Sequence, residues 1–150
     1  MKSILITGAF GQLGIACSKI LASKFNIIPT GINTDSSNSK LDVSSKKEVE
    51  VFLNQHKPDI ILNLAAMTDV DGCEHDPERA DKINREGVIN LCHDFDGHFI
   101  QLSTDYVFDG EDGPYLEDDS TNPVSIYGRT KLDAETYLIN SKVNHTIIRA

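Results

Sequence analysis

The chain has 150 residues, of which 39% are hydrophobic and 25% are charged, and a chain of this length and composition forms a single globular domain. Its formal net charge is −9, and the segment from Glu86 to Val124 holds ten acidic residues and no Lys or Arg. Nucleic-acid binding relies on Lys and Arg to neutralise phosphates, so a nucleic-acid partner is disfavoured.

Short apolar runs alternate with longer amphipathic stretches from one end of the chain to the other. In chain order we predict strand 3–7, helix 11–24, strand 26–32, helix 45–56, strand 59–63, helix 76–95, strand 98–103, helix 125–142 and strand 145–149. This alternation predicts an α/β fold, namely a Rossmann-type doubly wound parallel sheet with helices on both faces, which forms a three-layer sandwich.

Local signals support two of the helix starts and mark two connections. Ser44 or Ser45 precedes Glu48 as in a capping box, and residues 76–78 place a proline in a first helical turn. A further short strand or turn is expected close to residue 41. The segment 108–124 is rich in turn dipeptides, so we expect a long loop there, of the kind that often forms a lid or a binding loop.

The first predicted strand runs directly into three glycines at the start of the first predicted helix. Glycines placed in this way let the backbone turn tightly, admit a pyrophosphate close to main-chain N–H groups and let the helix pack on the strand. Their spacing is GxxGxxG rather than GxGxxG, and a glycine-rich corner that binds nothing is the alternative. The predicted dinucleotide contacts are Gly8, Phe10, Gly11, Gln12, Leu13 and Gly14.

The second predicted strand ends without the acid that usually selects NADH. That acid is expected near Gly31, which has no side chain, and residues 33–35 supply neither it nor an Arg for a 2′-phosphate. A missing carboxylate removes repulsion toward the phosphate, so NADPH is favoured over NADH. Asp42 and Val43 are candidate contacts for the adenine, although Asp42 is equally suited to the entry of the next helix.

A candidate catalytic group combines a phenol, an amine and a hydroxyl. Tyr127 and Lys131 are four residues apart and so project from one face of the last predicted helix. A phenol normally loses its proton near pH 10, and we expect the cation of Lys131 to favour the phenolate. Ser103 or Thr104 supplies a hydroxyl at the end of the fourth predicted strand, on the sheet edge that also carries residues 63–66. This convergence predicts a reductase in which Tyr127 gives a proton to a carbonyl. A surface Tyr/Lys pair without function is the alternative.

Four stretches carry a resemblance to a known family. They are ILITGAFGQLG at 4–14, PDIILNLAAMTDVDGCE at 58–74, LSTDYVFDG at 102–110 and PVSIYGRTKLDAE at 123–135. Over essentially all of its length the chain resembles the extended short-chain dehydrogenase/reductase family, and most closely its dTDP-4-dehydrorhamnose reductase group.

The resemblance implies both an activity and a set of site residues. It implies an NAD(P)H-dependent oxidoreductase that reduces a 4-keto nucleotide-sugar in dTDP-rhamnose biosynthesis, with the proton coming from Tyr127. It assigns catalysis to Thr104, Tyr127 and Lys131, and the last two also contact the cofactor, with Lys131 at the nicotinamide ribose. The residues that match the cofactor cradle are Gly8, Gly11, Gly14, Leu64, Ala65 and Ala66.

Other activities occur among similar proteins. Dehydratases of the family carry Asp-Glu after the catalytic Thr, whereas this chain has Asp105-Tyr106, which favours simple reduction. A nucleotide-sugar epimerase is disfavoured and stays an alternative. A second alternative is a non-catalytic NADP-binding protein that resembles the regulatory subunit of methionine adenosyltransferase.

The resemblance also bears on domain organisation. Family members continue past a segment like Ile148-Arg149 into the part that forms the nucleotide-sugar pocket. We therefore expect residues 1–150 to be an NAD(P)-binding Rossmann domain, a fragment that lacks most of the C-terminal substrate-binding part. A homodimer is one option for its oligomeric state.

The remaining signals concern compartment and metal. No apolar run reaches the roughly 18 residues that cross a bilayer, and the amino end lacks the apolar stretch of a signal peptide. The three cysteines, Cys17, Cys73 and Cys92, suit a reducing compartment, so we expect a cytoplasmic protein without a membrane partner. His75 and His93 lack zinc-site spacing relative to these cysteines, and no metal is expected. Asn84, within a predicted helix, either bonds loop backbone near the cofactor or lies on a solvated face.

Overall fold

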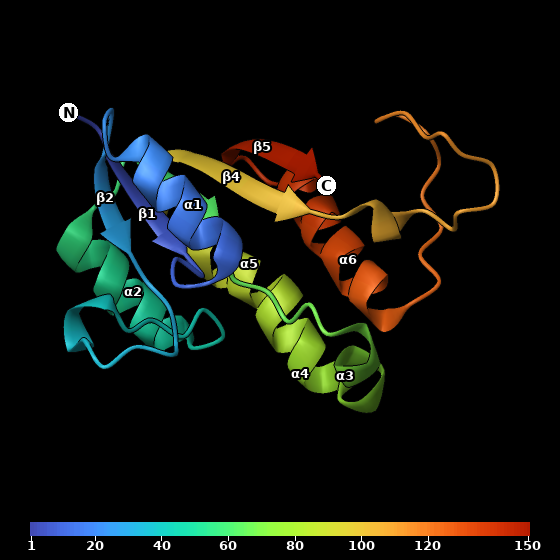
Figure 1. Ribbon diagram of the computed structural model, residues 1–150, viewed down its shortest axis with the longest axis horizontal. Coiled ribbons are helices and arrows are strands. Elements are labelled where there is room, and N and C mark those ends of the chain that lie inside the picture. Colours follow the sequence, from blue (N-terminus) through green and yellow to red (C-terminus); the bar gives the residue numbers. More distant parts are fainter.

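The computed structural model describes residues 1–150 and confirms the predicted α/β fold with a parallel sheet (Figure 1). The five strands lie in the order β2-β1-β3-β4-β5, and all neighbouring pairs are parallel. The strands are β1 (Ser3–Thr7), β2 (Asn26–Pro29), β3 (Ile60–Asn63), β4 (His98–Ser103) and β5 (Asn144–Arg149). The helices are α1 (Gln12–Leu21), α2 (Lys46–His56), α3 (Val70–His75), α4 (Pro77–Asp81), α5 (Gly87–Cys92) and α6 (Ile126–Asn140).

The strand order reverses at β1. Helix α1 connects β1 to β2 on one side of it, and the chain then returns through α2 to β3 on the other side. In doubly wound sheets ligands bind at such a switch point, in the crevice outside the carboxyl ends of the strands. The glycine turn and the segment after β3 lie on the two sides of this crevice.

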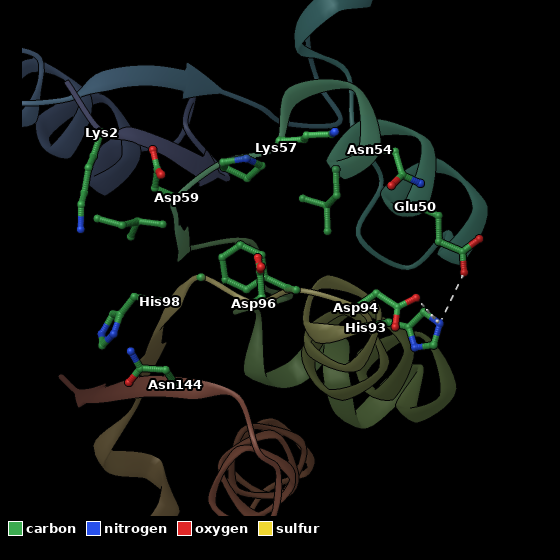
Figure 2. A pocket seen from close by; sticks show the side chains of 15 residues that line it. Lys2, Glu50, Asn54, Lys57, Asp59, His93, Asp94, Asp96, His98 and Asn144 are labelled. Atoms are coloured by element: carbon green, nitrogen blue, oxygen red, sulfur yellow. Dashed lines mark ion pairs between the residues drawn. The ribbon is translucent and has the colours of Figure 1, made fainter.

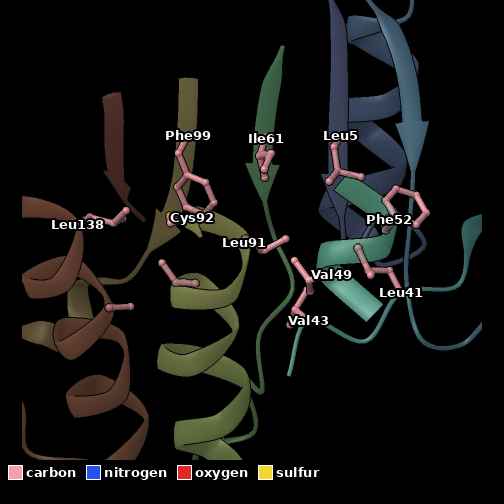
Figure 3. Close-up of a cluster of buried hydrophobic side chains, with 12 residues drawn as sticks. Leu5, Leu41, Val43, Val49, Phe52, Ile61, Leu91, Cys92, Phe99 and Leu138 are labelled. Carbon is pink, nitrogen blue, oxygen red and sulfur yellow. The ribbon is translucent and has the colours of Figure 1, made fainter. Parts of the chain in front are cut away.

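Helices cover both faces of the sheet, as predicted, but unequally. On one face α2, α5 and α6 pack on Leu5, Ile61 and Phe99, and twelve buried side chains form this main core (Figure 3). On the other face α1 packs over β1 and β2. The smaller core on that face consists of Ile4, Ile6, Ala9 and Leu62.

Strand β2 ends at Pro29 rather than at the predicted residue 32. Its main chain turns away at Gly31, whose N–H donates to the Ser39 carbonyl and whose carbonyl accepts from Leu41. The resulting isolated bridge confirms the short strand or turn expected near Leu41, which is itself buried.

The helix predicted over 76–95 is divided into three parts. Helix α4 is followed by a π-helical segment at Lys82–Glu86 and then by α5. A π segment adds a residue to one turn, which a search for a 3.6-residue apolar period does not reveal. Helix α3 was not predicted, because its six residues are mostly polar and too short for a periodic pattern.

The predicted caps and the predicted loop are confirmed. The Ser45 hydroxyl accepts a hydrogen bond from the N–H of Glu48 (3.4 Å), and the Asp76 carboxylate accepts one from the N–H of Arg79 (3.1 Å). The segment 108–124 contains neither helix nor strand. None of the helices combines the length and the apolar character that a bilayer crossing requires.

Candidate active site

A cleft of about 570 Å³ lies at the switch point, outside the carboxyl ends of β1 and β3. The structure brings ten of the residues predicted to contact the cofactor into its walls. They are Gly8, Gly11, Gln12, Leu13, Gly14, Asp42, Val43, Leu64, Ala65 and Ala66. Phe10, Thr104, Tyr127 and Lys131 do not line this cleft.

Two of the three glycines in the turn are sterically required. Gly8 has a φ of +63°, and a Cβ atom there would lie 3.0 Å from the main chain of Leu64 and Ala65. A Cβ atom at Gly14 would lie 2.3 Å from the carbonyl oxygen of Gly8. The turn is therefore a cradle made of main chain, in which a side chain has no room.

The amino end of α1 presents main-chain donors that no side chain occupies. Its N-cap residue is Gly11, which makes no side-chain bond, and its first turn has no acidic residue. Unpaired N–H groups and the helix dipole favour an anion at this end. Shape and charge at this end of the cleft both fit a pyrophosphate.

A buried polar network fixes the strand ends beside the cradle. The Thr7 hydroxyl donates to Asn63 Oδ1 (2.5 Å) and accepts from the N–H groups of Leu64 and Ala65 (3.1 Å each). Asn63 Nδ2 in turn donates to Gln101 Oε1 (2.8 Å). The network joins β1, β3 and β4. Sequence reasoning missed Thr7 and Gln101, although a polar residue in an apolar strand run is a usable signal.

The far end of the cleft contains Gly31 and Asp42, whose roles the sequence left open. The ring of Phe10 lies over Gly31, where a Cβ atom would approach its Cδ2 atom to 2.9 Å. A side chain at position 31 would therefore require the Phe10 ring to shift. Asp42 Oδ1 accepts hydrogen bonds from the N–H (2.9 Å) and hydroxyl (2.7 Å) of Ser44, which supports its role at the entry to α2.

The three residues predicted to be catalytic gather at the carboxyl end of β4. Thr104 follows β4 directly, and its hydroxyl accepts a hydrogen bond from the N–H of Tyr106 (3.1 Å). The Tyr127 ring also meets Tyr106 edge to face, with centroids 5.6 Å apart. Lys131 is 4% exposed, and its Nζ donates to the Leu102 carbonyl at 2.7 Å.

The ionisation of this group differs from the expectation. Burial raises the pKa of the Tyr127 phenol, and the nearby Thr104 side chain offsets only part of that rise. Burial lowers the pKa of Lys131 to about 8, against a smaller opposing effect of Glu135. The expected lowering of the phenol pKa by Lys131 is therefore not seen in this structure, because burial of the Tyr127 ring is the largest effect and raises that pKa. The phenol stays protonated at neutral pH, which suits a proton donor.

The cleft and the catalytic group meet at one residue. Leu102 lines the cleft together with residues that follow β1 and β3, such as Gly8 and Leu64. Its carbonyl oxygen accepts a hydrogen bond from Lys131 Nζ. Thr104 lies two residues further along the chain. Tyr127 and the glycine turn are thus on the same edge of the sheet.

Asn84 of the π segment holds the loop after β3 against α6. Its Oδ1 accepts from the N–H of Met67 (2.8 Å), and its Nδ2 donates to the Met67 carbonyl (3.1 Å) and to Thr130 Oγ1 (3.0 Å). Thr130 also bonds the Tyr127 carbonyl (3.0 Å). The structure therefore supports loop bonding over the solvated-face interpretation of Asn84, which is 1% exposed.

A larger hollow of about 870 Å³ lies at the opposite, amino-terminal edge of the sheet (Figure 2). Its lining is mostly polar and includes Lys2, Asp59, His98 and Asn144. None of the residues predicted to be functional belongs to it, and parallel sheets bind ligands at their other edge. No group of three or more His, Cys, Asp or Glu side chains is placed to hold a metal ion.

Comparison with known proteins places this geometry in a family. The family model described as "RmlD substrate binding domain" matches residues 1–150. The chain is 37% identical over 150 residues to a dTDP-4-dehydrorhamnose reductase of Sinorhizobium fredii, covering 97% of this chain and 49% of that protein.

Comparison with solved structures gives the same family. A dTDP-4-dehydrorhamnose reductase of Clostridium acetobutylicum has a TM-score of 0.88 and 42% identity, covering 99% of this chain and 52% of that one. The Bacillus anthracis reductase in complex with NADP has a TM-score of 0.89 and 30% identity, covering 99% and 53%. The chain spans about half the length of the curated relatives it matches. The chain belongs to the RmlD substrate binding domain family, within the extended short-chain dehydrogenases/reductases.

Proposed function

We propose that this chain is the NAD(P)-binding and catalytic part of a reductase acting on a 4-keto nucleotide-sugar, most specifically dTDP-4-dehydrorhamnose. The observation that carries the proposal is the meeting of the cleft and the catalytic group at Leu102. The reductase names of the relatives support this activity over an epimerase or a regulatory subunit. The three unpaired cysteines support a cytoplasmic setting.

The cofactor proposed for the cleft is NADPH, with NADH second. The main-chain cradle at Gly8 and Gly14 fits a pyrophosphate, and Gly31 leaves no carboxylate to repel a 2′-phosphate. The NADP complex of the Bacillus anthracis relative supports the same choice. When bound, the reduced nicotinamide supplies the hydride for the carbonyl carbon.

The residues of the chain supply the proton and the orientation. Thr104 and Tyr127 hydrogen-bond the carbonyl oxygen, and Tyr127 Oη gives it a proton. The Tyr127 phenol is protonated at neutral pH, so its proton is available for transfer. Lys131 holds the nicotinamide ribose, and its cation, one helical turn from Tyr127, stabilises the phenolate left after proton transfer.

The test is Tyr127→Phe in the protein expressed from its complete gene, with dTDP-4-dehydrorhamnose and NADPH. We expect kcat to fall about 10² to 10⁴-fold, the usual value of a general acid, while NADPH affinity measured by nicotinamide fluorescence stays within about twofold. Tyr137→Phe is the matched control, because it removes a phenol from the same helix on the main-core side. Equal rates for Tyr127→Phe and the unchanged protein would contradict the catalytic role.

A further inference from the structure

The loop 108–124 has a defined course although it lacks helix and strand. Asp109 organises its interior, with Oδ1 accepting from Tyr115 Oη (2.7 Å) and from the N–H of Glu111 (3.0 Å), and Oδ2 from Asn122 Nδ2 (2.9 Å). These bonds hold the pKa of Asp109 at about 2. The N–H of Asn122 closes the base of the loop on the Val107 carbonyl (2.9 Å).

A single arginine from β5 attaches this loop to the body of the protein. The guanidinium of Arg149 lies 5.2 Å from the centroid of the Phe108 ring, and its Nη1 donates to the Glu117 carbonyl (3.1 Å). The Phe108 ring stacks in parallel on Tyr115, with centroids 4.3 Å apart. Arg149 therefore touches the loop at two points nine residues apart in sequence.

The arginine is itself held by a buried carboxylate on the helix that carries Tyr127 and Lys131. Glu135 is 1% exposed, and it accepts from Arg149 Nη2 at 2.7 Å and from Nε at 3.1 and 3.2 Å. The Ser103 hydroxyl at the end of β4 also donates to Glu135. A bidentate arginine with a buried partner has a fixed orientation. A buried ion pair adds little net stability, so the contribution of this pair is to fix the guanidinium in place.

The attached loop forms a wall of a second cavity, of about 390 Å³, next to the catalytic group. From the loop come Phe108, Asp109, Gly110, Tyr115 and Val124, and from the core side Val70, Asp105, Tyr106 and Ser125. Tyr106 is the residue that meets Tyr127 edge to face. The course of the loop thus sets the shape of the space beside the proton donor.

We propose that Glu135 and Arg149 are positioning residues that hold the loop 108–124 as the wall of this cavity and thereby set the affinity for the substrate, without contacting it. The proposal rests on the reductase function above. It predicts that losing Arg149 raises KM for the nucleotide-sugar more than it lowers kcat and leaves NADPH affinity unchanged, because Arg149 does not line the cofactor cleft. Glu135→Gln also removes a charge that acts on Lys131, so unchanged NADPH affinity is expected of the Arg149 variants only.

The experiment compares Arg149→Met, Arg149→Lys and Glu135→Gln with the unchanged protein expressed from its complete gene. We expect amide hydrogen exchange in 108–124 to become about tenfold faster and KM for dTDP-4-dehydrorhamnose to rise about tenfold. Arg149→Lys should recover little, since an ammonium makes neither the bidentate pair nor the stacking contact. The matched control is Arg85→Met, which removes another bidentate pair, to Asp81 (2.5 and 2.7 Å), away from the loop.

Phe108→Leu is the second variant, because it removes the stacking ring and leaves the buried pair intact. It should reproduce the faster exchange in 108–124, and this readout tests the attachment of the loop even if the other variants fail to fold. Because Phe108 lines the cavity itself, its KM reports direct contact as well as the position of the loop. Unchanged exchange in the loop, or a KM no higher than that of Arg85→Met, overturns the proposal. Absence of turnover in the unchanged protein contradicts the reductase function instead, and the exchange rates then still decide whether the pair holds the loop.

Discussion

At the scale of single residues, the coenzyme end of the cleft depends on the contact between Phe10 and Gly31. A carboxylate at position 31 would have to displace the Phe10 ring, since its Cβ atom would lie 2.9 Å from Cδ2. The proposed preference for NADPH then depends on Gly31, which supplies no acid, and on the Phe10 ring beside it.

Gly31→Asp tests this pair. Alone it should displace the exposed Phe10 ring with little loss of stability and weaken NADPH binding through charge repulsion. Combined with Phe10→Ala it should keep that stability and shift the ratio of dissociation constants toward NADH, as measured by nicotinamide fluorescence and urea unfolding. Phe10→Ala alone is the control. An NADPH/NADH ratio that does not move in the double variant would refute the role of the pair.

Sequence reasoning at this scale found residue types and missed their environment. The glycine spacing predicted the turn because Gly8 and Gly14 have no alternative there. The predicted pKa direction of Tyr127 was wrong, because helical spacing placed Lys131 nearby but did not reveal how deeply the phenol is buried, and burial raises its pKa. The Glu135–Arg149 pair was also missed, since it joins two elements that the sequence does not show to be in contact.

At the scale of elements, the π segment at Lys82–Glu86 has a structural purpose. It directs Asn84 away from the helix and onto Met67 and Thr130, so that the loop after β3 and α6 keep a fixed separation. Strand positions were predictable because buried parallel strands are short apolar runs. The π segment could not be predicted in this way, because it depends on the contacts that Asn84 makes with other elements.

Asn84→Ala should leave two main-chain groups of Met67 and the Thr130 hydroxyl without this partner. We expect a loss of about 1 to 3 kcal/mol in the free energy of unfolding, together with a lower kcat. Asn90→Ala is the matched control, because Asn90 is on the same helical stretch and its Nδ2 bonds the Val43 carbonyl (3.0 Å) without touching α6. If the two variants lose activity equally at the same folded fraction, Asn84 has a stabilising role only.

At the scale of the whole molecule, the sheet gathers its polar side chains at one edge. Thr7, Asn63, Gln101 and Ser103 are all buried at the carboxyl ends of β1, β3 and β4. The alternation of strands and helices predicted this edge as the site, because parallel strands share one direction. Burying a lysine there has a cost in stability, and that cost depends on pH.

That dependence can be measured by comparing unfolding of the unchanged protein with that of Lys131→Met. The pKa of Lys131 is about 8 in the folded state, below its ordinary value of 10.5. Between these values the unfolded chain binds more protons than the folded one, so the free energy of unfolding rises with pH. Relative to Lys131→Met, the unchanged protein should therefore gain up to about 3 kcal/mol as pH rises from 8 to 10.5. Below about pH 7 the difference should be constant, because the amine is protonated in both states. A difference that stays flat across the whole range would show that the folded state does not disfavour the charge on Lys131.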